Sequence, residues 1–304
     1  MMPVSSFSSL PDRPADLFLF MGQSNMAGRG VPCARYPQSA PACLPGAGWE
    51  FRAVSDPSRL YPAAEPFGKE ENRPGGIYEP GMKTGSLATS FINAYYRETW
   101  TPVIGVSASK GGSAIREWQP GGAYLTDALE RLDTAEQYFS HHAVSIRHRF
   151  VLWCQGETDG DLGTSPEAYE EGFLSLRSAL LTHGMEHLFL IRIGCFNDMS
   201  QKAGSPDDRS RKDAALRNAA SSVSVPGNAD GGDQKQTVPD YAPIRAAQEH
   251  LALTCPDVTM VSRLFSGMRE QGLMKDAFHY YQHAYNLVGE DAGRHAAEYV
   301  RSLR

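Results

Sequence analysis

The order of apolar and polar positions along the chain predicts a sheet covered by helices. Short apolar runs bounded by turn residues alternate with stretches in which apolar residues recur every three or four positions. Such alternation is typical of parallel strands joined by helices. The apolar runs predict strands at 16–21, 102–107, 150–154, 188–194 and 258–261, and the helical spacing predicts helices at about 85–99, 166–183 and 282–302. The predicted fold class is therefore α/β, with a central, mostly parallel, five-stranded sheet.

Two long segments interrupt this alternation. Residues 31–84 carry many Pro and Gly with little periodicity, which predicts a long ordered insertion or a covering loop. Residues 198–240 are rich in Ser, Asp, Asn, Gly and Lys, and predict a mobile loop with at most one short helix near 211–220. No Pro- or Gly-rich seam divides residues 140–200, so we expect residues 1–304 to form a single domain with these two insertions.

Net charge and hydropathy argue against two classes of partner. The formal net charge is −6, so the chain lacks the excess of Lys and Arg that binding to a nucleic-acid backbone requires. The longest apolar stretches, such as 17–21 and 188–193, are far shorter than the roughly 20 residues that span a bilayer. We therefore expect no nucleic-acid partner and no membrane span. The start of the chain shows no secretory signal, which favours the cytoplasm unless a signal has been removed.

The cysteines predict no metal site. The five of them lie at no metal-ligand spacing, so we expect neither zinc nor another metal. Without a secretory signal, free thiols in a reducing compartment are the favoured interpretation. A disulfide between Cys33 and Cys43 in an oxidising compartment is the alternative.

Polar residues cluster at the predicted carboxyl ends of three strands. They form the turns 22–26, 109–113 and 155–159, which follow the first, second and third predicted strands. In an open parallel sheet, ligands bind in the crevice outside the carboxyl ends of the strands. The three turns therefore predict one site at that edge of the sheet.

Ser24 is the candidate nucleophile in the first turn. It directly follows a strand where a helix is about to begin, beside backbone N–H groups and the positive end of the helix dipole. Taken alone, a serine in such a turn is more often a helix cap. The nucleophile hypothesis therefore requires a base elsewhere in the chain.

The best candidate base is His279, which follows Asp276 by three residues. The carboxylate of Asp276 can accept the imidazole Nδ1–H and leave Nε2 free to take the serine proton. The alternative is that Asp276 caps a turn and His279 is a surface residue, which is the commoner case for an isolated pair. His283, one helical turn later, is the one rival among the histidines.

Ester hydrolysis also needs hydrogen-bond donors for the oxyanion of the transition state. The candidates are the backbone N–H groups of Ser24 and Gly112 and the side-chain amide of Gln155. Gly111 and Gly112 allow close approach of the backbone, although a simple tight turn explains the dipeptide equally well.

Together these turns resemble the SGNH hydrolase superfamily, and more closely its sialate O-acetylesterase and acetylxylan esterase group, carbohydrate esterase family six. Residues 22–28 resemble the family's first block, residues 110–115 with Trp118 its second, 153–159 its third and 276–279 its last. Weaker likenesses at 80–82 and 245–248 fall in the expected order. The resemblance therefore covers most of the chain.

The resemblance implies a three-layer α/β/α, flavodoxin-like fold and an acyl-enzyme mechanism without metal or cofactor. Ser24 would attack an acetyl carbonyl, His279 would act as general base and then acid, and Asp276 would orient the imidazole. Gly112 and Gln155, with the Ser24 N–H, would stabilise the oxyanion. The implied substrate is an acetylated carbohydrate of the acetylxylan or sialic acid type.

Four further residues of these blocks would support the site or bind substrate: Gln23, Asn25, Gly111 and Glu157. Glu157 would either brace the Ser24 turn or add a carboxylate near His279. The chain carries Gln23 and Gln155 where the wider superfamily has Asp and Asn, as expected for this subgroup. Two alternatives stay open, a carbohydrate-binding protein without turnover and an esterase for non-sugar short-chain esters.

Overall fold

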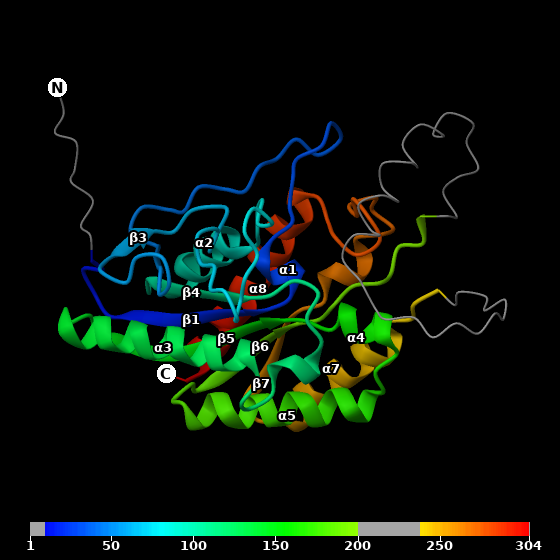
Figure 1. Ribbon diagram of the computed structural model, residues 1–304. Helices are drawn as coiled ribbons and strands as arrows, with labels where there is room; N and C mark the ends of the chain where they lie inside the picture. The colour runs from blue at the N-terminus through cyan, green and yellow to red at the C-terminus, as the bar shows by residue number, and fades with distance from the viewer. Residues whose placement is uncertain (1–9, 200–237, 304) are drawn as a thin grey trace.

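The computed structural model describes residues 10–199 and 238–303, and its centre is a seven-stranded sheet with helices on both faces (Figure 1). The strands are β1 (Ala15–Gly22), β2 (Gly48–Phe51), β3 (Leu60–Pro62), β4 (Val103–Ser109), β5 (Ile146–Cys154), β6 (His187–Ile191) and β7 (Val258–Ser262). Their order across the sheet is β3-β2-β4-β1-β5-β6-β7, and all neighbours are parallel except β2 and β3. The predicted α/β class with a mostly parallel sheet is confirmed.

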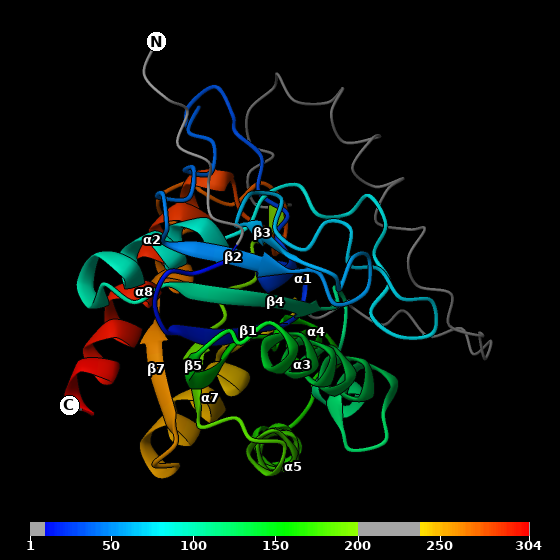
Figure 2. The same ribbon diagram turned by 90° about the vertical axis from the view of Figure 1, so that its left-hand side faces the viewer.

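The register of the central strands brings the predicted polar turns together. Gly22 at the end of β1 pairs with Ser109 at the end of β4 and with Cys154 at the end of β5. Figure 2 shows these three strands next to one another. Because the strands are parallel and end at the same level, the three polar turns that follow them start side by side.

The sheet has two strands more than the five predicted. Both β2 and β3 come from the segment 31–84, where we expected an insertion or a covering loop. They are four and three residues long, too short to stand out from their Pro- and Gly-rich surroundings. The five predicted strands are present, but the third begins earlier, at Ile146, and the fourth ends earlier, at Ile191.

Helices cover both faces of the sheet. The helices are α1 (Ser24–Ala27), α2 (Ala88–Thr99), α3 (Ala123–His141), α4 (Glu157–Leu162), α5 (Pro166–Thr182), α7 (Ala242–Thr254) and α8 (Gln282–Ser302), with 3-10 turns η1 (Ile115–Trp118) and η3 (Leu264–Gly267). The helices α2 and α8 pack on one face, whereas α3, α5 and α7 share an apolar cluster on the other (Figure 2). The three predicted helices correspond to α2, α5 and α8.

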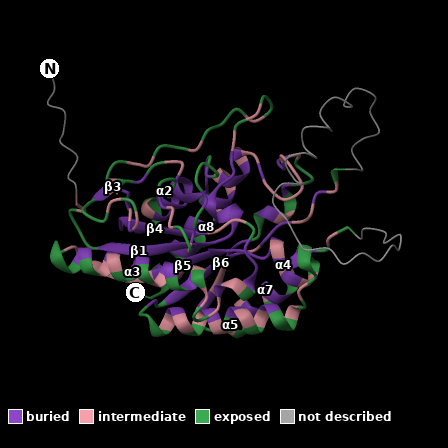
Figure 3. Cartoon of the chain, in the orientation of Figure 1, coloured by how far each residue is buried: buried purple, intermediate pink, exposed green. Residues whose placement is uncertain are grey.

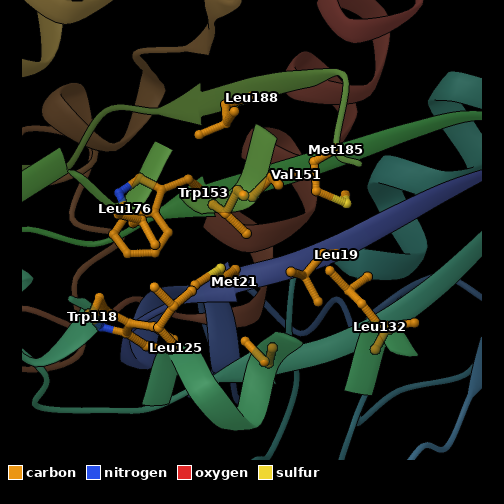
Figure 4. Packing of buried hydrophobic residues seen from close by; sticks show 14 of the residues in the cluster. Leu19, Met21, Trp118, Leu125, Leu132, Val151, Trp153, Leu176, Met185 and Leu188 are labelled. Carbon is orange, nitrogen blue, oxygen red and sulfur yellow. The ribbon is translucent and has the colours of Figure 1, made fainter. Parts of the chain in front are cut away.

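β1 is buried on both faces, which explains its uninterrupted apolar run. Leu17, Leu19 and Met21 belong to the cluster under α3 and α5, whereas Phe18 and Phe20 belong to the cluster under α2 and α8. Successive side chains of a strand point to opposite faces, so one apolar strand contributes to two cores. Figure 4 shows Leu19 and Met21 in the first cluster, and in Figure 3 the outer faces of α3 and α5 are exposed.

The long helix α3 was not among the predicted helices. α3 carries Leu125, Ala128, Leu132 and Ala135 on its buried face, at the spacing of three to four that defines an amphipathic helix. The signal was therefore present between the second and third predicted strands.

Several predictions concern residues that the structure does not describe. The helix expected near 211–220 and most of the loop expected at 198–240 lie outside the described residues. The single-domain organisation stays a prediction. No helix within 10–199 or 238–303 is long and apolar enough to cross a membrane.

Candidate active site

Ser24 lies where β1 ends and α1 begins. A single residue separates Gly22, the last of the strand, from Ser24, the first of the helix. The N–H of Gly28 donates to the Ser24 carbonyl and closes this one-turn helix, and Ser24 as a whole is only 6% exposed. The strand and the turn therefore fix the hydroxyl at the carboxyl edge of the sheet.

His279 reaches Ser24 from the turn before α8, 255 positions later in the chain. Its Nε2 lies 2.9 Å from Ser24 Oγ, and its Nδ1 lies 2.9 Å from Asp276 Oδ2. When Asp276 accepts the Nδ1–H, Nε2 is the acceptor for the serine proton. The structure thus brings into contact the three side chains that the sequence predicts to act together.

Asp276 is held as a carboxylate. Burial opposes its ionisation, but hydrogen bonds from the His279 side chain and from the backbone outweigh burial and lower its pKa to about 2. The backbone donors are the N–H groups of Phe278 and His279, at 3.0 and 2.7 Å from Oδ1. At neutral pH the carboxylate is therefore charged and oriented toward the imidazole.

Gly111 lies beside Ser24, and Gly112 follows it in the turn. A Cβ added to Gly111 would lie 3.3 Å from the Ser24 Cβ and 2.4 Å from Glu79 Oε1, so a side chain there would force Glu79 to shift. Gly112 adopts a positive φ of 70°. Within the described chain, the N–H groups of Ser24 and Gly112 have no protein acceptor. Both N–H groups are therefore available to an oxyanion.

The side chain of Gln155 is engaged elsewhere, which corrects the oxyanion role expected of it. The residue is fully buried, and its Nε2 donates to Ser113 O at 2.9 Å and to Asp159 Oδ2 at 2.5 Å. An amide has two N–H bonds, and both are used here. Gln155 therefore fixes the second and third turns to each other and leaves no donor for the oxyanion.

Gln23 and Asn25 tie the first turn to its neighbours. Gln23 Oε1 accepts the N–H of Gly156 at 2.9 Å. Asn25 Nδ2 donates to Glu157 Oε1 at 2.6 Å and to Phe278 O at 3.0 Å. Both residues are buried, so they support the Ser24 turn rather than face a substrate.

Glu157 braces the Ser24 turn through Asn25. Burial raises its pKa to about 7, although the hydrogen bond from Asn25 acts in the opposite direction. The side-chain hydrogen bonds of His279 go to Ser24 and Asp276. Of the two roles implied for Glu157, the structure therefore favours the brace over an additional carboxylate for the imidazole.

Two charged residues at the site were not predicted. Glu79 Oε1 accepts from the Gly111 N–H and from Arg29 Nη2, each at 2.7 Å, and both side chains are buried. Glu79 comes from the segment 31–84, whose length suggested a role at the site without indicating a residue. A carboxylate in a segment without periodicity carries no sequence signal of burial.

The cysteines form no disulfide, and the described residues contain no metal-ligand cluster. All five cysteines are free thiols, so the alternative disulfide between Cys33 and Cys43 is not formed. Among the residues described, no group of three or more His, Cys, Asp or Glu side chains could hold a metal ion.

At the carboxyl edge of the parallel sheet, a serine contacts an imidazole, and the imidazole contacts a carboxylate. This arrangement is typical of serine hydrolases. The chain belongs to the carbohydrate esterase family described as sialic acid-specific acetylesterase, whose model matches residues 14–225. The matched residues include the three polar turns but end before Asp276 and His279. The predicted resemblance to SGNH-type carbohydrate esterases is confirmed at the level of the family.

Similar proteins agree with this assignment. A probable carbohydrate esterase from Arabidopsis thaliana is 30% identical over 162 residues, which cover 49% of this chain and 56% of that protein. The sequence match thus spans little more than half of the relative's length. The family and this relative are both described as carbohydrate esterases.

Two solved structures share the fold. The crystal structure of the same Arabidopsis protein has a TM-score of 0.61 at 20% identity, over 94% of this chain and 99% of that chain. A carbohydrate acetylesterase from Xanthomonas citri has a TM-score of 0.52 at 18% identity, over 93% of this chain and 57% of that chain.

Proposed function

We propose that this chain is a serine esterase that removes O-acetyl groups from carbohydrates through an acyl-enzyme intermediate. The observation that carries the proposal is the contact of Ser24 Oγ with His279 Nε2 at 2.9 Å, with Asp276 on the other imidazole nitrogen. A serine is a weak nucleophile until an adjacent base takes its proton, and this geometry supplies the base.

The arrangement supports a two-step reaction. His279 takes the Ser24 proton as Oγ bonds to the acetyl carbonyl carbon, and it then gives that proton to the departing sugar oxygen. In the second step, His279 takes a proton from water as the water oxygen bonds to the acetyl carbon, and the proton returns to Ser24 Oγ as its bond to that carbon breaks. The product is acetic acid, which ionises to acetate in solution. Asp276 stabilises the imidazolium in both steps.

Backbone donors are proposed to stabilise the oxyanion. The Ser24 and Gly112 N–H groups lack protein acceptors among the described residues, and Gly111, the neighbour of Gly112 in the chain, approaches Ser24 closely. Donors that are already oriented toward the developing charge need no reorganisation during the reaction, and losing one costs about 10²- to 10³-fold in kcat. Two such donors support the proposed acyl transfer.

The proposed substrate is an acetylated carbohydrate, of the sialic acid or acetylxylan type. The description of the family names sialic acid, and the relatives are described as carbohydrate esterases. This choice of substrate rests on the family, whereas the chemistry rests on the geometry of the site.

The test compares the protein with Ser24→Ala and His279→Ala on p-nitrophenyl acetate, acetylated xylan and O-acetylated sialic acid. We expect each substitution to lower kcat by at least about a thousandfold, because hydroxyl and base act as one unit. The matched control is His283→Ala, which should keep its activity. It removes an imidazole of α8 that stacks on the Tyr36 ring.

Three outcomes contradict parts of the proposal. Near-normal turnover in Ser24→Ala or His279→Ala contradicts the mechanism in which Ser24 is the nucleophile and His279 is its base. Sugar binding without turnover in the unchanged protein indicates the carbohydrate-binding alternative. Turnover of p-nitrophenyl acetate alone, with neither sugar substrate deacetylated, indicates the esterase for non-sugar esters.

A further inference from the structure

The turn that carries Gly112 is fixed at both ends. The Lys110 N–H donates to Gly22 O at 2.8 Å, which joins the turn to the end of β1. Ser113 Oγ donates to Lys110 O at 2.7 Å, and Gln155 Nε2 donates to Ser113 O at 2.9 Å. These bonds do not fix the orientation of the peptide group between Gly111 and Gly112.

That peptide joins two glycines, so neither of its own residues has a side chain that restrains it. A peptide group between two residues without Cβ can rotate between alternative turn conformations at little steric cost. Rotation by half a turn would reverse the direction of the Gly112 N–H, which is a proposed oxyanion donor. An oxyanion donor at this position therefore needs something else to hold the peptide.

Lys110 contacts the carbonyl side of this peptide. Its Nζ donates to Gly111 O at 2.8 Å. In a trans peptide the C=O and the N–H point in opposite directions, so an ammonium that holds Gly111 O directs the Gly112 N–H to the opposite side. A charged donor on the carbonyl also polarises the peptide and strengthens its N–H as a donor.

The surroundings of Lys110 suit this role. Its side chain is half-buried, and Nζ lies 5.9 Å from the centre of the Tyr124 ring, which belongs to the first turn of α3. No carboxylate among the described residues lies within 4.0 Å of Nζ. The positive charge is thus directed at the Gly111 carbonyl rather than neutralised by an ion pair.

Glu79 holds the other side of Gly111. Its Oε1 accepts the Gly111 N–H at 2.7 Å, while Arg29 Nη2 lies 2.7 Å from the same oxygen. An unpaired carboxylate here would repel the negative charge that develops on the oxyanion, and the Arg29 guanidinium offsets it. Gly111 is therefore held by a carboxylate at its N–H and by an ammonium at its C=O.

We propose that Lys110 is a positioning residue of this esterase, which locks the Gly111–Gly112 peptide by its carbonyl so that the Gly112 N–H faces the oxyanion. The inference rests on the proposed function above and adds a residue to it. Lys110 does not contact the reacting atoms, and its effect passes through the peptide that it holds.

The test uses Lys110→Met, which keeps the length of the side chain and removes the ammonium. We expect kcat on p-nitrophenyl acetate to fall about ten- to a hundredfold, less than the loss of a whole oxyanion donor, with KM within about twofold. Lys110→Arg retains a cationic donor and should recover part of the loss. Lys69→Met, at an exposed lysine whose Nζ is 3.9 Å from Glu70, is the matched control and should match the unchanged protein.

An amide NMR spectrum with glycine-selective ¹⁵N labelling reports on the peptide without any turnover. We expect the Gly112 resonance to move in Lys110→Met and to stay in place in Lys69→Met. A fall in kcat with the Gly112 resonance unmoved, or a moved resonance with kcat unchanged, overturns the proposal. Absence of any Ser24-dependent turnover in the unchanged protein refutes the proposed esterase function. In that case the spectrum of Lys110→Met still tests the contact with the peptide, and an unmoved Gly112 resonance refutes the role of Lys110 as well.

Discussion

Glu157 shows how burial beneath the site controls the charge of a single residue. Burial raises its pKa to about 7, and within the described chain its Oε2 has no hydrogen-bond partner. The folded protein therefore keeps a proton that the unfolded chain releases at about pH 4.5. The stability that this proton contributes is fully present below that pH and is lost as the pH rises through about 7.

Glu157→Gln mimics the protonated carboxyl and can still accept from Asn25. We expect it to raise the free energy of unfolding at pH 8 by up to about 3 kcal/mol and to change it little at pH 4. Urea denaturation at the two pH values measures this difference. Glu290→Gln, at an exposed position of α8, is the control and should behave alike at both. Equal or lower stability of Glu157→Gln at pH 8 would contradict the assigned burial cost.

At the scale of elements, α8 is connected to the one-turn helix α1 through a buried hydrogen bond. The Tyr285 hydroxyl donates to Asn25 Oδ1 at 2.6 Å. Asn25 in turn donates to Glu157, at the start of α4, and to the carbonyl of Phe278 in the turn before α8. The side chain of Asn25, the residue after the candidate nucleophile, thus joins α1 to α4 and to α8.

Tyr285→Phe removes this connection while keeping the ring. Because the Asn25 oxygen is then buried without a donor, we expect a loss of about 1 to 3 kcal/mol in the free energy of unfolding and a reduced kcat. Chemical denaturation and p-nitrophenyl acetate kinetics measure the two effects. Tyr36→Phe removes an exposed hydroxyl that donates to Gln271 O, and it should cost less than Tyr285→Phe. Equal costs for the two variants would argue against the buried connection.

At the scale of the whole molecule, the rules of parallel sheets made the site predictable. Three polar turns at strand ends had to meet once β1 lay between β4 and β5, and the register confirms that they do. The pairing of Ser24 with His279 could be predicted from residue types, because a nucleophilic serine requires a base and, of the nine histidines, His279 follows an Asp by three positions.

Other features could not be predicted because local pattern carries no trace of them. The two short strands of segment 31–84 exist only through pairing with β4 and with each other. The burial of Glu79 depends on Arg29 and Gly111, which are distant in sequence. The engagement of Gln155 depends on Ser113 and Asp159, so its expected role failed for a tertiary reason.

The most direct test of the account is labelling with a fluorophosphonate, followed by mass spectrometry of the modified peptide. The reagent bonds to a serine whose hydroxyl is activated by a neighbouring base. We expect one modified residue, Ser24, and loss of labelling in His279→Ala. Modification of a different serine, or labelling of Ser24 at an unchanged rate without His279, would contradict the claim that these two residues act together.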